Sequence, residues 1–241
     1  MIDFLLILLL IFAGQTLGSL IGLVKKPGRV TLYGSLSFAA SMMIAISFIQ
    51  LIPEGLKYAP LFLITISFFA GVAIMLIVDP LLPHINPELV KKEKPSVKRS
   101  VTMLVIGIGL HNIPEGLAIG VGFALASELG IAIALAIAIQ DLPENIATIV
   151  PLYGMTKKKA KSFGILITTV LFEVFGFFLG YLVLKGTSLS WLGASLALAA
   201  GFMVYISVEE LIPSAQIKKY PKMATITMTL GVICVLLISL V

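Results

Sequence analysis

Two short stretches of the sequence place carboxylates, amides and a histidine inside long apolar runs. One reads HNIPE, from His111 to Glu115, and the other reads QDLPE, from Gln140 to Glu144. A further acid, Glu173, interrupts a third apolar run. A carboxylate that is buried away from water must be protonated or paired with a positive charge. These residues therefore predict either buried neutral acids or a bound cation.

The spacing within each stretch places its polar side chains on one face of a helix. His111 and Asn112 precede Glu115 by four and three residues, and the second stretch repeats this spacing ahead of Glu144. Residues three and four apart lie over one another on a helix. Two such helices side by side would gather an imidazole, amides and carboxylates. The side chains gathered in this way are His111, Asn112, Glu115, Gln140, Asp141 and Glu144.

A proline stands directly before the glutamate in both stretches. Pro114 and Pro143 have no N–H to donate, so the carbonyls of Leu110 and Ile139 lose their helical partners. We therefore expect a helix kink at each proline. Such kinks are tolerated inside a membrane where neighbouring groups or water satisfy the freed carbonyl, typically beside a cavity.

The mixture of side chains favours a divalent transition metal as the cation. An imidazole with several carboxylate and amide oxygens suits Zn²⁺, Fe²⁺ or Mn²⁺, whereas sodium or calcium would not need the histidine. The four carboxylates could balance two divalent ions, with Glu115 and Glu144 as bridges. An anionic substrate is disfavoured, because no lysine or arginine lies in these apolar runs.

The elements that carry these residues must be membrane-spanning helices. The chain of 241 residues is 59% hydrophobic and 12% charged, and its mean hydropathy is +1.11. Soluble domains carry roughly 25% charged residues, and a transmembrane helix needs about 20 apolar residues. The runs are continuous, whereas the strands of a membrane barrel alternate. The fold class is thus all-α, and eight spans are predicted at residues 2–24, 31–53, 60–82, 99–125, 129–152, 162–185, 189–213 and 222–241.

The acids in the apolar runs lie near the middle of these spans. At a rise of 1.5 Å per residue, Glu115 lies about 24 Å along the fourth span, Glu144 about 23 Å along the fifth and Glu173 about 17 Å along the sixth. No lysine or arginine lies at that depth. A bound cation is therefore the expected partner, and a protonated carboxyl bonded across helices is the alternative for any single acid.

The basic residues predict the orientation of the spans. Fifteen of the seventeen lie in or beside loops that follow odd-numbered spans, and only Lys57 and Lys185 follow even-numbered ones. Because basic loops stay in the cytoplasm, both termini are predicted outside, and the net charge of +5 reflects topology and not nucleic-acid binding. The chain forms one domain, residues 1–241, with a cytoplasmic loop at about 83–98. A single cysteine, Cys234, excludes a disulfide framework and a cysteine zinc site.

HNIPEG in the fourth span and the matching PE pair in the fifth resemble the ZIP (Zrt/Irt-like protein) family of divalent metal transporters, and prokaryotic members in particular. Eight spans, a long loop after span 3 and outer termini are similar to that family over essentially the whole chain. The resemblance implies that the metal ligands are His111, Asn112, Glu115, Gln140, Asp141, Glu144 and Glu173. Many members begin the fifth-span motif with histidine, where this chain has Gln140, a pattern similar to bacterial members with a two-metal site. It also implies a thioether ligand from span 2, for which Met43 is preferred to Met42.

A second polar layer is expected toward the cytoplasm. Asp79 closes span 3, and Glu209 and Glu210 lie near the inner end of span 7. In the family, a His-Glu pair at this place resembles part of an inner metal site, and here Glu209 replaces the histidine. These three acids would form an inner exit site or gate, or else they rest at the membrane interface.

A weak internal repeat relates the two ends of the chain. FIQLIPEGL (48–56) ends span 2 on the outside, and VEELIPSA (208–215) ends span 7 on the inside. Like ends on opposite sides predict inverted repeats, spans 1–3 against spans 6–8, around a central pair of spans 4 and 5. Inverted repeats with a site at the midplane imply alternating access, and the resemblance implies that a four-helix transport unit slides against a scaffold.

These observations favour uptake of a divalent metal cation, with Zn²⁺ as the substrate and Cd²⁺, Fe²⁺ or Mn²⁺ as alternatives. We expect a multi-pass protein of the cytoplasmic membrane, in contact with the lipid bilayer, without an organic cofactor, and either monomeric or homodimeric. Two other functions stay open at this point. An intramembrane metal-dependent enzyme would be expected to carry a motif such as HExxH, which the chain lacks. A proton-coupled carrier of an organic cation would need an aromatic cage near the acids.

Overall fold

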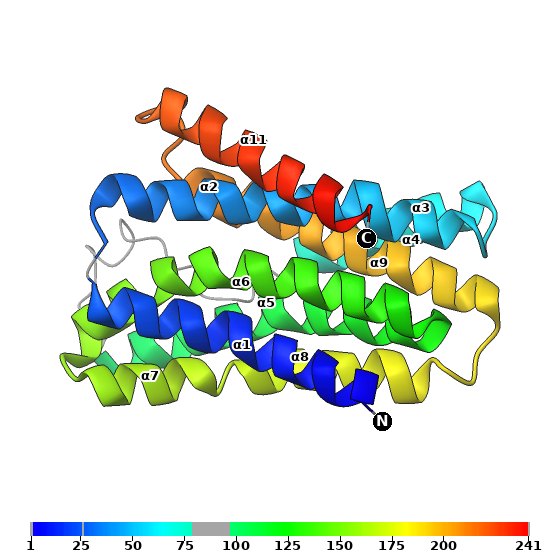
Figure 1. Ribbon diagram of the computed structural model, residues 1–241, viewed down its shortest axis with the longest axis horizontal. Coiled ribbons are helices and arrows are strands. Elements are labelled where there is room, and N and C mark those ends of the chain that lie inside the picture. The colour runs from blue at the N-terminus through cyan, green and yellow to red at the C-terminus, as the bar shows by residue number, and fades with distance from the viewer. Residues whose placement is uncertain (1, 26, 79–96, 241) are drawn as a thin grey trace.

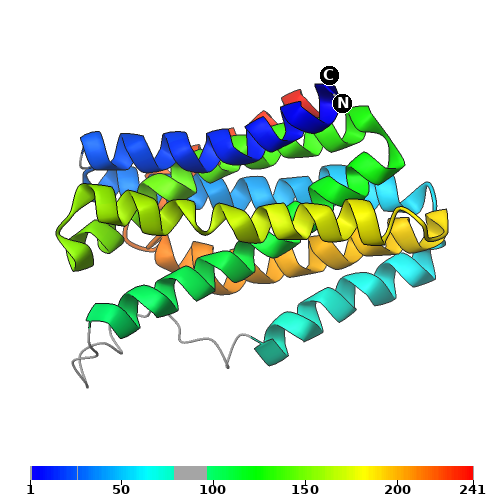
Figure 2. The same ribbon diagram turned by 90° about the horizontal axis from the view of Figure 1, so that it is seen from below.

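The computed structural model describes residues 2–25, 27–78 and 97–240, and over those ranges it consists of helices and turns. Eight helices are long and apolar enough to cross a membrane, as predicted, and they form one elongated bundle (Figure 1, Figure 2). The bounds of the helical segments are α1 Ile2–Val24, α2 Arg29–Ala45, η1 Ile46–Leu51, α3 Ile52–Leu56, α4 Leu61–Val78, α5 Val97–Leu125, α6 Ser127–Thr156, α7 Lys159–Ile167, α8 Val170–Phe178, η4 Leu179–Val183, α9 Leu189–Ile206, η5 Ser207–Leu211, α10 Ile212–Ser214 and α11 Pro221–Ile238.

The observed helices extend beyond several of the predicted spans. Span 2 continues to Leu56, and α5 begins at Val97, so the last two residues of the predicted loop at 83–98 are helical. Lysine and arginine are good helix formers, which lets a helix continue past the hydrocarbon core. The rest of that loop, and Asp79, lie outside the described residues.

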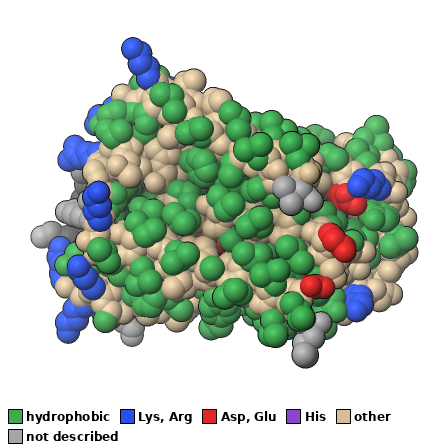
Figure 3. All heavy atoms as spheres, viewed as in Figure 1, with side chains coloured by type: hydrophobic (Ala, Val, Ile, Leu, Met, Phe, Trp, Pro, Cys, Tyr) green, Lys and Arg blue, Asp and Glu red, His purple; other side chains and the backbone are tan. Residues whose placement is uncertain are grey.

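The surface of the bundle is suited to a bilayer. Figure 3 shows lysine and arginine side chains gathered at its left end, with apolar side chains over the middle. Large apolar residues such as Leu5, Phe62 and Leu237 are more than half exposed. So many apolar side chains on the surface of one chain would be costly in water. The chain is therefore a multi-pass membrane protein.

The eight spans pack as two groups of four. The first, which we name the site bundle, contains α1, α5, α6 and the segment from α7 to η4. The second, the flanking bundle, contains α2 to α3, α4, α9 to α10 and α11. The two groups meet mainly where α2 lies against α6 and where α5 lies against α9.

Glycines bring the helices within each group into close contact. A Cβ atom at Gly14 of α1 would lie 2.8 Å from the Cα of Ala138 in α6, and one at Gly176 of α8 would meet the Ile113 carbonyl of α5. In the flanking bundle, a Cβ at Gly201 of α9 would meet the backbone of α4. Small residues let two backbones approach closely. None of the described glycines makes such an approach between the two groups, so each bundle is more tightly interlocked than the boundary between them.

Irregular turns interrupt spans 2, 6 and 7. The π-helical segments η1 and η5 each end just before an Ile-Pro pair, Ile52-Pro53 and Ile212-Pro213 respectively. Proline lacks the N–H that a regular turn would use, and a wider turn is one way to absorb that loss. Spans 2 and 7 share this local structure, and the inverted repeat itself stays a prediction. Span 6 is also broken between α7 and α8, at Thr168 and Thr169.

The first testable prediction concerns the crossing of α5 and α8. We expect Gly176→Ala to destabilise the protein by about 1–3 kcal/mol, because a side chain overpacks the crossing. Gly164→Ala on the same span is the matched control, since a Cβ there meets nothing within 4 Å, and alanine gains up to about 1 kcal/mol of helix propensity. Thermal unfolding of the purified proteins in detergent measures both. Equal midpoints would show that the close approach is not needed for stability.

Candidate metal site

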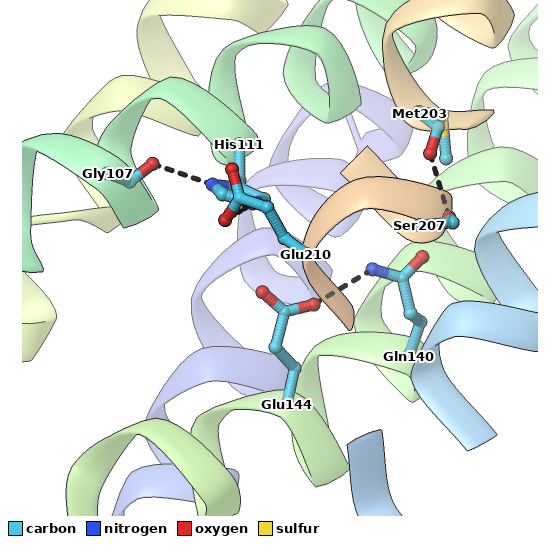
Figure 4. Close-up of polar contacts among 7 residues, drawn as sticks. All are labelled: Gly107, His111, Gln140, Glu144, Met203, Ser207 and Glu210. Atoms are coloured by element: carbon cyan, nitrogen blue, oxygen red, sulfur yellow. Dashed lines mark hydrogen bonds and ion pairs between the residues drawn. The ribbon is translucent and has the colours of Figure 1, made fainter. Parts of the chain in front are cut away.

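α5 and α6 form a helical hairpin that brings the two polar stretches together. The chain turns at Ala126, so HNIPE and QDLPE lie on adjacent helices that run in opposite directions. Gln140 connects them, because its Nε2 donates to Glu115 Oε1 at 2.7 Å and to Glu144 Oε2 at 3.3 Å. Figure 4 shows the amide of Gln140 turned toward Glu144.

Three buried carboxylates lie close enough together to hold one ion. An oxygen from each of Glu115, Asp141 and Glu144 lies within 4.8 Å of the others, and these residues are 1%, 2% and 8% exposed. Oxygens that bind one Zn²⁺ at about 2.1 Å lie roughly 3 Å apart, so modest side-chain rotations bring these oxygens into one coordination shell. Every lysine and arginine whose side chain the structure describes is exposed. The charge that balances this cluster must therefore come from elsewhere.

The imidazole of His111 has one nitrogen occupied by the backbone and one turned toward a carboxylate. Its Nδ1 lies 2.7 Å from the Gly107 carbonyl oxygen, which can only accept a hydrogen bond, so Nδ1 carries the proton. Its Nε2 lies 3.0 Å from Glu210 Oε2, and Figure 4 shows the two side chains face to face. A backbone bond that fixes one ring nitrogen and leaves the other for a metal is the usual arrangement of a histidine ligand.

Glu173 and Asn112 are held by a separate set of hydrogen bonds. Gln15 of α1 donates from Nε2 to Glu173 Oε2, and Asn112 donates from Nδ2 to the Thr169 carbonyl at 3.1 Å. Glu173 is fully buried and close enough to Glu115 and Asp141 for their charges to interact. The acid of span 6 thus belongs to the same electrostatic cluster as those of spans 4 and 5.

Several buried oxygens around this cluster have no hydrogen-bond partner among the described residues. They are Gln140 Oε1, Asp141 Oδ2, Asn145 Oδ1 and Glu173 Oε1. Buried polar atoms are nearly always paired, and a group of exceptions needs an explanation such as an ion. All four are oxygens, the atoms that carboxylate and amide side chains offer to a metal. The donor set therefore fits one or two divalent cations.

The methionines of span 2 and Glu209 of span 7 were also predicted as candidate ligands. Met42 and Met43 are both buried, and Met42 faces α11, since a Cβ on Gly231 would lie 3.3 Å from its Cγ. The preference for Met43 as the thioether ligand stays a prediction. Glu209 is exposed.

Glu210 was expected in a polar layer separate from the central site. It instead contacts His111 and so lies beside that site. The predicted depth of each residue in the membrane follows from the number of residues between it and the end of its helix. α5 has 29 residues, about 43 Å of helix, and Figure 2 shows it running obliquely to α8. A long tilted helix carries His111 closer to the inner end of span 7 than the count implies.

The two prolines do not end their helices. α5 stays helical through Pro114 and α6 through Pro143. The predicted kinks stay predictions, but the prolines are compatible with helices that carry the site without interruption.

Two buried amides near the acids were not expected from the sequence. Gln15 contacts Glu173, and Asn145 donates from Nδ2 to the Asp141 carbonyl at 3.0 Å. Asn145 directly follows Glu144 in the sequence, so its proximity could have been noticed. The signal for Gln15 is a glutamine in an otherwise apolar helix, directly after the first of three glycines four residues apart, Gly14, Gly18 and Gly22. That spacing is typical of a tight helix crossing.

Comparison with known proteins identifies the family of the chain. The family model described as ZIP Zinc transporter matches residues 84–239. Proteins named "Zinc transporter ZupT" from Salmonella arizonae, Salmonella heidelberg and Salmonella newport are each 35% identical to the chain over 227 residues, which is 88% of this chain and 86% of theirs. The matched region contains both polar stretches and Glu173, and the chain belongs to the ZIP family of zinc transporters.

Proposed function

We propose that this chain carries Zn²⁺ across the cytoplasmic membrane into the cell, through the site formed by α5, α6 and α8. The observation that carries the proposal is the group of three buried carboxylates, Glu115, Asp141 and Glu144, with oxygens within 4.8 Å of one another. Membership of a transporter family sets aside both an intramembrane enzyme and a carrier of organic cations.

The donor atoms divide into two overlapping sets. His111, Glu115 and Glu144 supply one imidazole nitrogen and two carboxylates for a first ion. Asp141, Glu173 and Asn112 supply oxygens for a second, with Glu115 and Glu144 as bridges. Two divalent ions would balance the four carboxylates, which is the charge balance that a low-dielectric site requires.

In this proposal Gln140 becomes a metal ligand only after its side-chain amide rotates. Its Nε2 donates to Glu115 and Glu144, and its Oε1 is buried without a hydrogen-bond partner among the described residues. A cation between the two glutamates competes with these N–H groups. Rotation of the amide would then present Oε1 to the ion, so Gln140 ligates only after it turns.

The pair of His111 and Glu210 links binding to movement between the bundles. His111 belongs to the site bundle and Glu210 to the flanking bundle, and their contact at 3.0 Å uses the nitrogen that a metal needs. Zn²⁺ therefore releases the bond between the bundles when it binds His111, and Glu210 regains that bond when the metal leaves. In this proposal Glu210 acts as the gate on the cytoplasmic side of the site, one of the roles that the sequence predicts for it.

The packing of the two bundles supports sliding of one against the other. Each described glycine that brings two backbones together joins helices of the same bundle. Each bundle can therefore move as a rigid body. Inverted repeats around a midplane site allow the same site to open to either side.

The first test of this function removes the ligands. We expect His111→Ala and Glu115→Gln to lower ⁶⁵Zn²⁺ uptake into proteoliposomes by more than about tenfold, since even outer-shell changes at metal sites cost about 10–100-fold. Glu128→Gln is the matched control, because Glu128 is exposed at the start of α6, and its uptake should equal that of the parent. Uptake that persists in both ligand variants would show that the site is misassigned.

The second test separates the gate from the ligands. Glu210→Gln removes the carboxylate that faces His111 Nε2. We expect a lower KM for Zn²⁺, because the metal no longer competes with this carboxylate, and a lower maximal rate, because release slows. Initial rates in proteoliposomes at varied Zn²⁺ give both constants. A KM that rises as far as in His111→Ala would instead make Glu210 a ligand of the same ion.

The third test concerns the choice of ion. The histidine and carboxylates favour transition metals over hard cations, so Cd²⁺, Fe²⁺ and Mn²⁺ should compete with ⁶⁵Zn²⁺ uptake while Mg²⁺ and Ca²⁺ in equal excess should not. Competition by Ca²⁺ in this assay would argue that His111 does not bind the transported ion.

A further inference from the structure

α1 contributes an amide to the metal site without contributing a charge. Gln15 is 1% exposed, and its Nε2 donates to Glu173 Oε2. Its Oε1 accepts a hydrogen bond from Thr169 Oγ1 at 3.3 Å. The Thr169 hydroxyl also donates to the Leu166 carbonyl at 2.7 Å, so its one proton is shared between two acceptors. The bond to Glu173 is therefore the main one that sets which way the amide faces, because a carboxylate only accepts and must meet the N–H group of Gln15.

The backbone around Gln15 holds this side chain in place. On one side, Gly14 and Gly18 press α1 against α6, where a Cβ at either position would clash. The helix cannot rotate without separating from α6, so the amide is fixed toward α8.

The same hydrogen bonds continue to a second candidate ligand. Thr169 lies at the break between α7 and α8, four residues before Glu173, and it is fully buried. Its carbonyl accepts the bond from Asn112 Nδ2 at 3.1 Å. Hydrogen bonds thus connect the side chains of Glu173, Gln15 and Thr169 and continue from the Thr169 backbone carbonyl to Asn112, across three helices.

The bonds at the two ends of this chain leave specific oxygens for a ligand. Glu173 has one oxygen bound to Gln15, and its Oε1 is buried without a hydrogen-bond partner among the described residues. Asn112 uses its nitrogen on Thr169, which leaves its carbonyl oxygen as the atom that can ligate. A flexible carboxylate loses orientational freedom when it binds a metal, which costs affinity. A carboxylate that is already held in place avoids this cost.

We propose that Gln15 is a positioning residue of the metal site, which holds Oε2 of Glu173 so that Oε1 faces the cation. The inference rests on the proposed function, because it requires Glu173 to be a ligand. It makes α1 the fourth helix of the site, although α1 supplies no ligand itself. Outer partners that orient ligands commonly change metal affinity by about 10–100-fold.

A double-mutant cycle on the full chain tests this role. The variants are Gln15→Leu, Glu173→Gln and the combination, reconstituted in proteoliposomes with ⁶⁵Zn²⁺ as the probe. We expect Gln15→Leu to raise KM by about tenfold with a smaller change in the maximal rate. In the Glu173→Gln background, the same substitution should have no further effect on KM, because residues that act through one another are not additive.

Two further variants separate positioning from folding. Gln15→Met keeps the length of the side chain and removes only the amide, and it replaces Gln15→Leu in the cycle if that variant is not recovered. Ser19→Ala is the control on the next turn of α1, since its hydroxyl bonds only within the helix, and its KM should match the parent. Additive effects on KM, or a loss of thermal stability with KM unchanged, would reduce Gln15 to a packing residue.

The outcomes also distinguish this proposal from the one on which it rests. If Glu173→Gln transports like the parent while His111→Ala does not, Glu173 is no ligand and the role of Gln15 fails, but the transport function stands. If His111→Ala and Glu115→Gln transport normally as well, the proposed site itself is wrong.

Discussion

The structure depends on one electrostatic constraint, the burial of four carboxylates without a buried lysine or arginine among the described residues. Charged groups in a membrane interior are costly and must be paired or neutralised. Only one imidazole, His111, lies among them, and it already contacts Glu210. A protein that required these acids only for stability could replace them with apolar side chains of similar size at little cost. Their presence is understandable if the missing positive charge is the cargo.

The packing of the helices follows from the need to hold those acids within a few ångströms. The hairpin of α5 and α6 supplies three of the four, and α8 reaches them only because Gly116 and Gly176 let its backbone touch that of α5. Gln15 enters in the same way through the glycines of α1. The boundary toward the flanking bundle lacks such contacts among the described glycines, and there the connection is polar, between His111 and Glu210. Tight apolar packing therefore surrounds the site on one side, and a bond that a metal can exchange closes it on the other.

Much of this could be predicted from the sequence, because the signals are local. A run of about 20 apolar residues indicates a span by its length alone, and a spacing of three or four residues puts Asn112 and His111 on the face of Glu115. The tilt of α5 is not local. It depends on how eight helices pack. It explains why Glu210 contacts His111, although counting residues along the helices places the two at different depths. Gln15 was missed for the same reason, since a lone glutamine gains its role only from the helix that it faces. The π-helical turns and the break at Thr169 also have no clear sequence signal beyond the prolines that follow two of them.

The position of His111 explains how binding and movement could be linked without a long pathway. Coupling between a ligand and a conformational change requires that the ligand interact differently with the two states. His111 Nε2 cannot bond to Glu210 and ligate an ion at the same time, so occupancy of the site and the bond between the bundles exclude each other. In the proposed site, protons would enter the same competition, because they bind the carboxylates that the metal would need. A cation that met only carboxylates would have no such effect on the boundary between the bundles. In the proposed site, His111 would therefore do more than supply a ligand, since its Nε2 is the atom through which the flanking bundle can respond to whether the site is filled.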